Sequence, residues 1–317
     1  MGIKNFEPYK KSTYQWKPGH EKALRITKSS LTSDFDFCPK QYEFKRIDGR
    51  KTPQTDDMLR GTNVHDAMEV FFINVKPAVN KILGLAKDNK DEEAFELMLK
   101  CLPEPEEPYH LDEEPILQKR LEWEYARLIA SDGVDYLPIM NEDELHAFFD
   151  HTVEVNGFVH TVPIHMAGAV DRGFRTEEGK VALMELKTGK WRIGDIYKPR
   201  SMRYEMAFYA DLMKKADHPL KDVTHWGWLF PGGGRLGDGH EDHWGYEKVS
   251  KRYFTKVKKG FDALIEAYIL NNFPPTPSEG KCAWCSFIED CPAWKEGGDK
   301  YWRAFKRPQY VNKGGNK

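Results

Sequence analysis

Residues 171–187 read DRGFRTEEGKVALMELK, a stretch that can close as a β-hairpin with two acids facing each other. The middle of the stretch, TEEG, is rich in turn-forming residues. If Thr176 pairs with Lys180 across a three-residue turn, Asp171 lies directly opposite Glu185, with Cβ atoms roughly 4.5–5.5 Å apart. Two carboxylates this close repel each other unless a cation lies between them. Hard oxygen ligands suit Mg²⁺ or Mn²⁺, so the pattern predicts a divalent-metal site.

Lys187 and the apolar residues before it distinguish a functional site from an ordinary charged surface. Lys187 follows Glu185 by two residues, so its side chain projects from the same face of the strand. The alternative is a solvated charged patch on an edge strand. The run KVALMEL at 180–186 is apolar on both faces, however, which is typical of a central, covered strand. Charges at the end of such a strand are costly unless they are paired or bind a metal, so we expect a site.

The composition indicates a soluble intracellular protein with a sizeable core. The chain has 317 residues, 40% of them hydrophobic and 13% aromatic, which suits one large domain or two modest ones. Its formal net charge is only −2, so any nucleic-acid-binding surface must be local. The N-terminus has no apolar signal segment, and no run is long enough to span a bilayer. We expect a cytoplasmic protein, of cellular or phage origin, that does not contact membranes.

The order of expected elements predicts an α/β fold in which helices flank a mixed sheet. Four regions follow one another: an irregular arm at 1–26, a mainly helical part at 27–145, a sheet-containing core at 146–275, and a cysteine-rich segment with a basic tail at 276–317. Strands are expected at 147–155, 158–166, 167–175, 180–187, 223–230 and 244–248. Helices are expected as a short one capped at Ser29-Ser30, at 57–75, over most of 80–130, from about Ser201, and after Ser250.

Four of the five cysteines can hold a metal. Three follow a Cys-x₂-Cys-x₅-Cys pattern, and a fourth lies far upstream: Cys282, Cys285, Cys291 and Cys38. Four thiolates suit a [4Fe–4S] cluster or a structural Zn²⁺, and the alternative is a set of reduced thiols packed beside aromatic residues. Either metal would act mechanically, by closing almost the whole chain into a loop. The remaining Cys101 is expected to be an ordinary thiol.

His65 is a third candidate metal ligand. It lies on the expected helix 57–75, where Glu69 shares its face four residues later. A histidine in this position can equally be a core residue. Beside a metal-ready acid pair it becomes a credible ligand, with Glu69 able to orient it.

A basic and aromatic segment follows directly after the acid pair. Between Lys187 and Tyr204 its cations and rings are Lys190, Trp191, Arg192, Tyr197, Lys198, Arg200 and Arg203. Alternating charges and rings are what single-stranded nucleic acid needs, since cations bind phosphates and rings stack on bases. The alternative is a solvated loop, but its position beside the acids favours substrate contact.

Together these residues resemble the RecB-like branch of the PD-(D/E)XK nuclease superfamily, and most of all its iron–sulfur members, which include the CRISPR-associated RecB-type exonucleases. The resemblance runs from about Ser29 to Pro292. The stretches that carry it are Ser30-Leu31…Phe35…Cys38-Pro39…Tyr42, Arg60-Gly61-Thr62…His65…Glu69, Gly168-Ala169-Val170-Asp171-Arg172, Glu185-Leu186-Lys187-Thr188-Gly189, Glu205…Tyr209 and the terminal cysteines. The implied fold is a restriction-endonuclease-like core, covering 146–275, with a cysteine-cluster staple at the C-terminus.

The resemblance also implies a role for each site residue. His65, Asp171, Glu185 and the Leu186 carbonyl would bind catalytic Mg²⁺ or Mn²⁺, and Lys187 would position or activate the attacking water. The four cysteines would hold a [4Fe–4S] cluster, for which structural Zn²⁺ is the alternative. The expected nucleic-acid-binding residues are Arg60, Lys190, Trp191, Arg192, Arg203 and Tyr209.

Two residues depart from the family pattern. Val170 stands where the superfamily name has proline, which the RecB-like branch tolerates. Glu205 stands where this branch usually has glutamine, and a carboxylate there would repel phosphate. The sequence has no phosphate-binding G-x₄-G-K-[ST] run, so we expect no helicase motor within it.

The expected function is a metal-dependent deoxyribonuclease, an exonuclease that acts on single strands or frayed ends. Its expected setting is DNA repair, recombination, or phage or CRISPR DNA processing, with proteins of those pathways as partners. The alternative is a non-catalytic DNA-binding or complex-assembly module that retains the fold. The complete set of His65, Asp171, Glu185 and Lys187 argues against this alternative, because a scaffold has no need of four costly groups.

Overall fold

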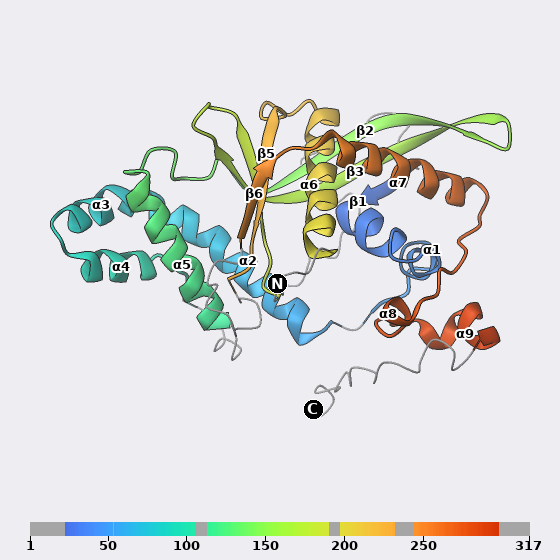
Figure 1. Ribbon diagram of the computed structural model, residues 1–317, viewed down its shortest axis with the longest axis horizontal. Coiled ribbons are helices and arrows are strands. Elements are labelled where there is room, and N and C mark those ends of the chain that lie inside the picture. Colours follow the sequence, from blue (N-terminus) through green and yellow to red (C-terminus); the bar gives the residue numbers. More distant parts are fainter. Residues whose placement is uncertain (1–22, 53, 105–112, 190–196, 232–243, 298–317) are drawn as a thin grey trace. The chain divides into compact units, whose positions relative to one another are not determined.

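A computed structural model of the chain describes residues 23–52, 54–104, 113–189, 197–231 and 244–297 (Figure 1). The chain divides into two compact units, each assembled from segments that are distant in sequence. The described residues of the first unit fall within 56–147 and 168–251, and those of the second within 16–55, 148–167 and 252–297. The units therefore interleave the four regions expected from sequence.

The strands form a six-stranded sheet with parallel and antiparallel pairs, so the expectation of a mixed sheet is confirmed. They are β1 (Leu24–Thr27), β2 (Met140–Val155), β3 (Phe158–Arg175), β4 (Val181–Leu186), β5 (Val223–Leu229) and β6 (Trp244–Lys248). The order across the sheet is β1-β3-β4-β5-β6, and β2 pairs with β3. The pairs β3–β4 and β5–β6 are antiparallel, whereas β1–β3 and β4–β5 are parallel.

The helical elements account for most of the remaining described residues. The longer helices are α2 (Asp56–Val75), α3 (Val79–Lys87), α4 (Asp91–Leu99), α5 (Glu113–Ala130), α6 (Tyr197–Lys215) and α7 (Lys251–Ile269). The short ones are η1 (Ser30–Phe35), α1 (Pro39–Tyr42), η2 (Glu43–Ile47), η3 (Lys76–Ala78), α8 (Glu279–Cys282), η4 (Ile288–Asp290) and α9 (Pro292–Gly297). Among the described residues, no helix combines the length and apolar character needed to cross a membrane.

The hairpin of β3 and β4 has the expected register. The backbone N–H of Thr176 donates to the Lys180 carbonyl at 2.9 Å, and Arg172 pairs with Met184. The same register, continued by one residue, brings Asp171 opposite Glu185. β4 lies between β3 and β5 and is buried on both faces, so the prediction of a covered central strand is confirmed. The parallel pairing of β4 with β5 requires a crossover, which α6 supplies.

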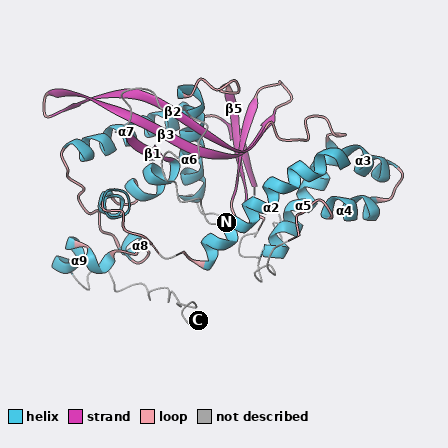
Figure 2. Ribbon diagram, turned by 180° about the vertical axis from the view of Figure 1, so that it is seen from behind, coloured by secondary structure: helices cyan, strands magenta, loops and turns pink. Residues whose placement is uncertain are grey.

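Two helical layers cover the sheet within the first unit. Helices α2, α3, α4 and α5 lie together (Figure 2). They pack around an apolar cluster that includes Val64, Phe71, Leu121 and Leu186. Leu186 and, at its edge, Leu229 bring β4 and β5 into this cluster. Helix α6 packs on β4 and β5, and it also has a buried row of apolar side chains.

Within the second unit, β1 pairs with residues 164–167 of β3 and leads into a capped turn. The Ser30 N–H donates to Thr27 Oγ1 at 3.2 Å, and the Thr27 N–H donates to Ser30 Oγ at 2.7 Å. This reciprocal arrangement is a capping box whose cap is Thr27. Of the expected cap at Ser29-Ser30, Ser30 takes part in this box, whereas the Ser29 side chain makes no capping hydrogen bond. Residues 24–26, expected to belong to an irregular arm, are part of strand β1, which ends at Thr27.

The main correction concerns β3, which is continuous over residues that sequence divides into two strands. Gly168 lies next to the expected division, and a glycine inside a strand weakens the strand pattern. A Cβ atom at Gly168 would lie 2.9 Å from the Tyr209 ring, so the glycine allows close packing of α6 and does not break the strand. β2 also begins earlier than expected, at Met140. Its early start was not predicted because the residues after Met140 are the polar run NEDE, which lacks the apolar alternation of a strand.

Candidate functional site

The acid pair lies at the end of the β3–β4 hairpin. Asp171 is 6% exposed, and its Oδ2 accepts a hydrogen bond from the Leu186 N–H at 2.8 Å. Glu185 is 2% exposed and forms an ion pair with Lys187. The hairpin register puts both acids on the same face of the sheet. Two buried carboxylates side by side need compensating positive charge.

His65, on α2, brings an imidazole to the same end of the hairpin. Its Nε2 donates to the Leu186 carbonyl oxygen at 3.0 Å, and its Nδ1 donates to Glu142 Oε1 at 2.9 Å. Nδ1 also lies 3.8 Å from Asp171 Oδ2. The structure therefore brings together His65, Asp171 and the Leu186 carbonyl, three of the four expected ligands, with Glu185 across the hairpin from Asp171.

The protonation of His65 reflects this acidic environment. Burial alone would lower the pKa of His65, but the carboxylates of Asp171, Glu142 and Glu185 outweigh it and raise the pKa to about 9. At neutral pH both ring nitrogens carry protons and act as donors, in agreement with the two hydrogen bonds. The imidazolium thus supplies the positive charge that the carboxylates need.

The donor set fits a divalent cation. One ligand atom from each of His65, Glu142 and Asp171 lies within 4.8 Å of the others. The Leu186 carbonyl adds a further oxygen beside the imidazole. Carboxylate and carbonyl oxygens with one imidazole suit Mg²⁺ or Mn²⁺. Binding of such an ion would displace a proton from His65, because a metal ligand must offer a lone pair.

Lys187 is held between two acids. Besides its ion pair with Glu185, its Nζ donates to Glu205 Oε2 at 3.1 Å. Glu205 comes from α6, is 5% exposed, and also accepts from Ser201 Oγ at 3.2 Å. The departure from the family's glutamine therefore has a structural counterpart: the carboxylate binds the lysine of the site.

Sequence reasoning missed Glu142 and Arg172. Glu142 lies near the start of β2 with φ of 55°, a left-handed conformation that costs a non-glycine residue on the order of 1 kcal/mol. Arg172, 3% exposed, donates from Nη1 to Glu142 Oε1 at 2.8 Å. Glu142 also takes the contact with His65 Nδ1 that was expected of Glu69. The polar run around Glu142 has no periodicity that could have indicated a role for this residue. For Arg172 the signal was its position directly after Asp171 in the hairpin.

The expected nucleic-acid-binding residues have different environments. Arg60 is mostly covered and pairs with Asp57, four-fifths of which is exposed. Arg203 makes a two-bond ion pair with Glu247 and lies over the Trp228 ring. Tyr209 is 3% exposed and packs against Gly168, which gives it a packing role and argues against direct DNA contact. Lys190, Trp191 and Arg192 lie outside the described residues.

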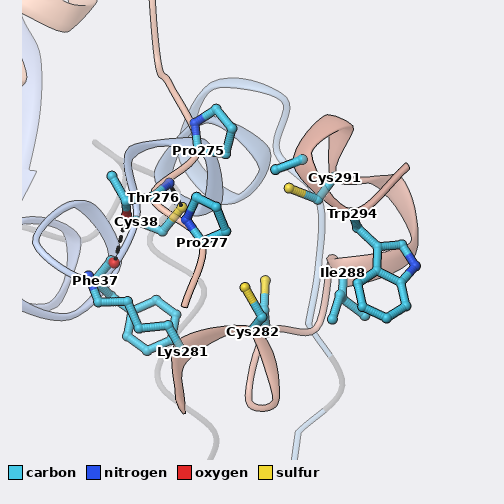
Figure 3. Close-up of a pocket in the computed structure, with 12 residues that line it drawn as sticks. Phe37, Cys38, Pro275, Thr276, Pro277, Lys281, Cys282, Ile288, Cys291 and Trp294 are labelled. Atoms are coloured by element: carbon cyan, nitrogen blue, oxygen red, sulfur yellow. Dashed lines mark hydrogen bonds between the residues drawn. The ribbon is translucent and has the colours of Figure 1, made fainter. Parts of the chain in front are cut away.

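The four clustered cysteines line one pocket in the second unit. Cys38, at the start of α1, faces Cys282, Cys285 and Cys291 from the segment after α7. Figure 3 shows the sulfurs of Cys38, Cys282 and Cys291 turned toward a common space. The Thr276 N–H donates to Cys38 Sγ at 3.4 Å, the kind of bond that supports a thiolate ligand.

The thiols are coupled electrostatically. Burial, followed by the neighbouring cysteines, raises the pKa of Cys285 to about 11, and the pKa of Cys282 also rises. Four thiolates so close together require a positive centre, so the pocket fits a metal or an iron–sulfur cluster. Cys101 does not line this pocket; it belongs to the helical cluster of the first unit, and its thiol donates to the Leu97 carbonyl at 3.4 Å.

Comparison with known proteins gives one clear match. The family model described as the PD-(D/E)XK nuclease superfamily matches residues 29–292. No curated protein matches the chain significantly. The crystal structure of SSO0001 is 13% identical over 88% of this chain and 89% of its own, with a TM-score of 0.37. A candidate exonuclease from Eubacterium rectale is 10% identical over 88% and 94%, with a TM-score of 0.44. These scores are too low to carry an argument about fold or function.

Proposed function

Because the chain belongs to the PD-(D/E)XK nuclease superfamily, we propose that it is a metal-dependent deoxyribonuclease that degrades DNA from single-stranded or frayed ends. One observation carries the proposal: His65, Asp171 and the Leu186 carbonyl converge at the end of a hairpin that also presents Glu185 and Lys187. Proteins of repair, recombination, CRISPR or phage DNA processing are its expected partners.

The proposed ligands of the cation are His65 Nε2, Asp171, Glu185 and the Leu186 carbonyl oxygen. A bound Mg²⁺ or Mn²⁺ would polarise the scissile phosphate and lower the pKa of a water molecule. Asp171 keeps its orientation through the Leu186 N–H, so the backbone that offers the carbonyl also fixes the carboxylate. This coupling holds two of the ligands in one geometry before substrate arrives.

Lys187 is proposed to position the attacking water and to stabilise charge that develops on the phosphate oxygens. Its ammonium group is held by Glu185 and Glu205, so it reaches the site from a defined direction. Hydrolysis adds the water oxygen to phosphorus and releases one ester oxygen as an alcohol, with the water protons passing to solvent and the leaving oxygen.

Contacts to DNA are proposed for Arg60 and for Lys190, Trp191 and Arg192, which follow the hairpin in the sequence. Cations there would bind phosphates and the indole would stack on a base. Arg203 could join only by exchanging its ion pair with Glu247 for a phosphate.

For the cysteine pocket we propose a [4Fe–4S] cluster with a structural role. Support comes from four thiols that line one pocket and from an N–H that donates to Cys38. Protein purified without oxygen should be brown and contain about four iron and four sulfide per chain. Colourless protein with one zinc per chain would replace the cluster by Zn²⁺ without affecting the nuclease proposal.

The nuclease proposal is tested with Asp171→Asn. Asparagine keeps an oxygen acceptor for the Leu186 N–H, so the variant should fold, but it loses the charge that binds the cation. Cleavage of an end-labelled single-stranded oligonucleotide in Mn²⁺ should fall by roughly two to three orders of magnitude. Wild-type protein that binds DNA but does not cleave it with any divalent cation would favour a non-catalytic DNA-binding module.

A further inference from the structure

The buried Arg172 and the partly buried Glu142 form an ion pair beside the imidazole of His65. Glu142 Oε1 accepts hydrogen bonds from both His65 Nδ1, at 2.9 Å, and Arg172 Nη1, at 2.8 Å. Arg172 also donates to the Asp171 carbonyl. The pair therefore links the histidine and the aspartate of the site through one arginine.

The two nitrogens of His65 face different groups. Nε2 points at the Leu186 carbonyl oxygen, 3.0 Å away, which is a proposed ligand of the cation. Nδ1 points at Glu142, whose oxygen already accepts from Arg172. A histidine that binds a metal through one nitrogen usually donates the other N–H to a carboxylate, which fixes the ring's tautomer and orientation.

We infer that Glu142, anchored by Arg172, is a positioning residue that keeps the proton of His65 on Nδ1 and directs the Nε2 lone pair to the cation. The inference rests on the proposed function only in taking His65 as a metal ligand. Neither residue touches substrate in this assignment.

The surroundings of the pair support a dedicated role. The Asn141 side-chain amide donates to the Glu69 carbonyl of α2 at 3.0 Å, and the Arg172 guanidinium lies 5.3 Å from the Phe72 ring of the same helix. Together with the hydrogen bond between Glu142 and His65, these two contacts connect β2 and β3 to α2 at three places. The backbone of Glu142 is in the left-handed conformation, which is unfavourable for a non-glycine residue. Strain of this kind persists where the surroundings hold a residue in place.

The competing arrangement makes Glu142 a direct ligand, together with His65 and Asp171. It would require the cation to bind on the Nδ1 side of the ring, where Glu142 Oε1 already accepts two hydrogen bonds. The two arrangements predict opposite tautomers of His65, with the proton on Nδ1 in one case and on Nε2 in the other.

The test compares Glu142→Gln with Glu144→Gln, an exposed position two residues along the same strand. Mn²⁺ affinity is measured by electron paramagnetic resonance of the free ion. The tautomer of His65 is read from long-range ¹H–¹⁵N NMR of Mg²⁺-loaded, histidine-labelled protein, with His65→Gln to assign the signal. Should Glu142→Gln fail to fold, Arg172→Lys serves as the second variant, because it keeps the charge but cannot reproduce the guanidinium's geometry.

We expect Glu142→Gln to weaken Mn²⁺ binding by about tenfold or more, and Glu144→Gln to leave it within twofold of wild type. Wild-type His65 should carry its proton on Nδ1. A proton on Nε2, or unchanged Mn²⁺ affinity in Glu142→Gln, would overturn the inference. Neither readout requires DNA cleavage, so an inactive protein with these binding properties would contradict the proposed function and leave this inference standing.

Discussion

At the scale of single residues, Lys187 has the most informative surroundings. Its ammonium group is shared between Glu185, on its own strand, and Glu205, from α6. Family resemblance leads one to expect glutamine at position 205 and a contact with DNA. The ion pair explains how a carboxylate can stand there: its charge is matched by the lysine and does not face phosphate.

Glu205→Gln tests this explanation. Glutamine keeps one oxygen that can accept from Lys187, while its NH₂ group replaces the oxygen that accepts from Ser201, so the lysine should stay in place. We expect the cleavage rate to fall by less than about a hundredfold, the lower end of what one positioned acid–base group contributes, with Mn²⁺ affinity unchanged. Glu205→Ala, which removes the acceptor, should lose more activity than Glu205→Gln, and equal losses would contradict the explanation.

The protonation of His65 predicts how stability depends on pH. Because its pKa is raised from the ordinary 6.5 to about 9, protonation favours the folded state. The contribution is complete below pH 6.5 and disappears as the pH rises through 9. In protein kept in a metal chelator, the free energy of unfolding should therefore drop between these pH values by on the order of 2–3 kcal/mol. Urea unfolding checks this, and His65→Gln should lack the drop.

At the scale of elements, the hairpin of β3 and β4 was predictable because its signals are local. A turn-rich TEEG between two apolar runs specifies both register and face, so Asp171, Glu185 and Lys187 come together as expected. Glu142 could not be found this way. It belongs to a polar run, its backbone is left-handed, and its partners His65 and Arg172 are 77 and 30 residues away. Such contacts exist only after the elements pack.

The packing of α6 on β3 predicts opposite effects for two glycine substitutions. In Gly168→Ala the new Cβ would lie 2.9 Å from the buried Tyr209 ring, so the variant should lose roughly 1–3 kcal/mol of stability. In Gly84→Ala, on α3, nothing lies within 4 Å of the new Cβ. Alanine favours helix, so this variant should gain about 0.5–1 kcal/mol. Thermal or urea unfolding measures both, and a neutral Gly168→Ala would show that the contact can relax.

At the scale of the whole molecule, the cysteine pocket joins segments that lie at opposite ends of the sequence. Cys38 is 244 residues from Cys282 and 253 from Cys291. The number and spacing of the cysteines were sufficient to predict the pocket. The division into two interleaved units was not predictable, because it depends on β1 pairing with the distant residues 164–167.

Cys285→Ser tests the mechanical role of this pocket. Closing a loop of this length lowers the conformational entropy of the unfolded chain. For a disulfide this effect stabilises the folded state by roughly 5 kcal/mol. The variant should lose bound metal and unfold at a clearly lower urea concentration. Cys101→Ser is the matched control, since Cys101 lies in the other unit, and it should retain the full metal content. Loss of metal without loss of stability would contradict a stapling role.

The turn at Thr176–Gly179 contacts no proposed ligand or substrate group, yet its length decides which residues face Asp171. Strand side chains alternate between faces, so inserting or deleting one residue there would present Met184 or Leu186 in place of Glu185. Natural length variation at this exposed tip should therefore be almost as rare as change in the acids themselves. Peptide tags or fused domains, for which an exposed hairpin tip would ordinarily be chosen, belong instead at the Asn156-Gly157 turn.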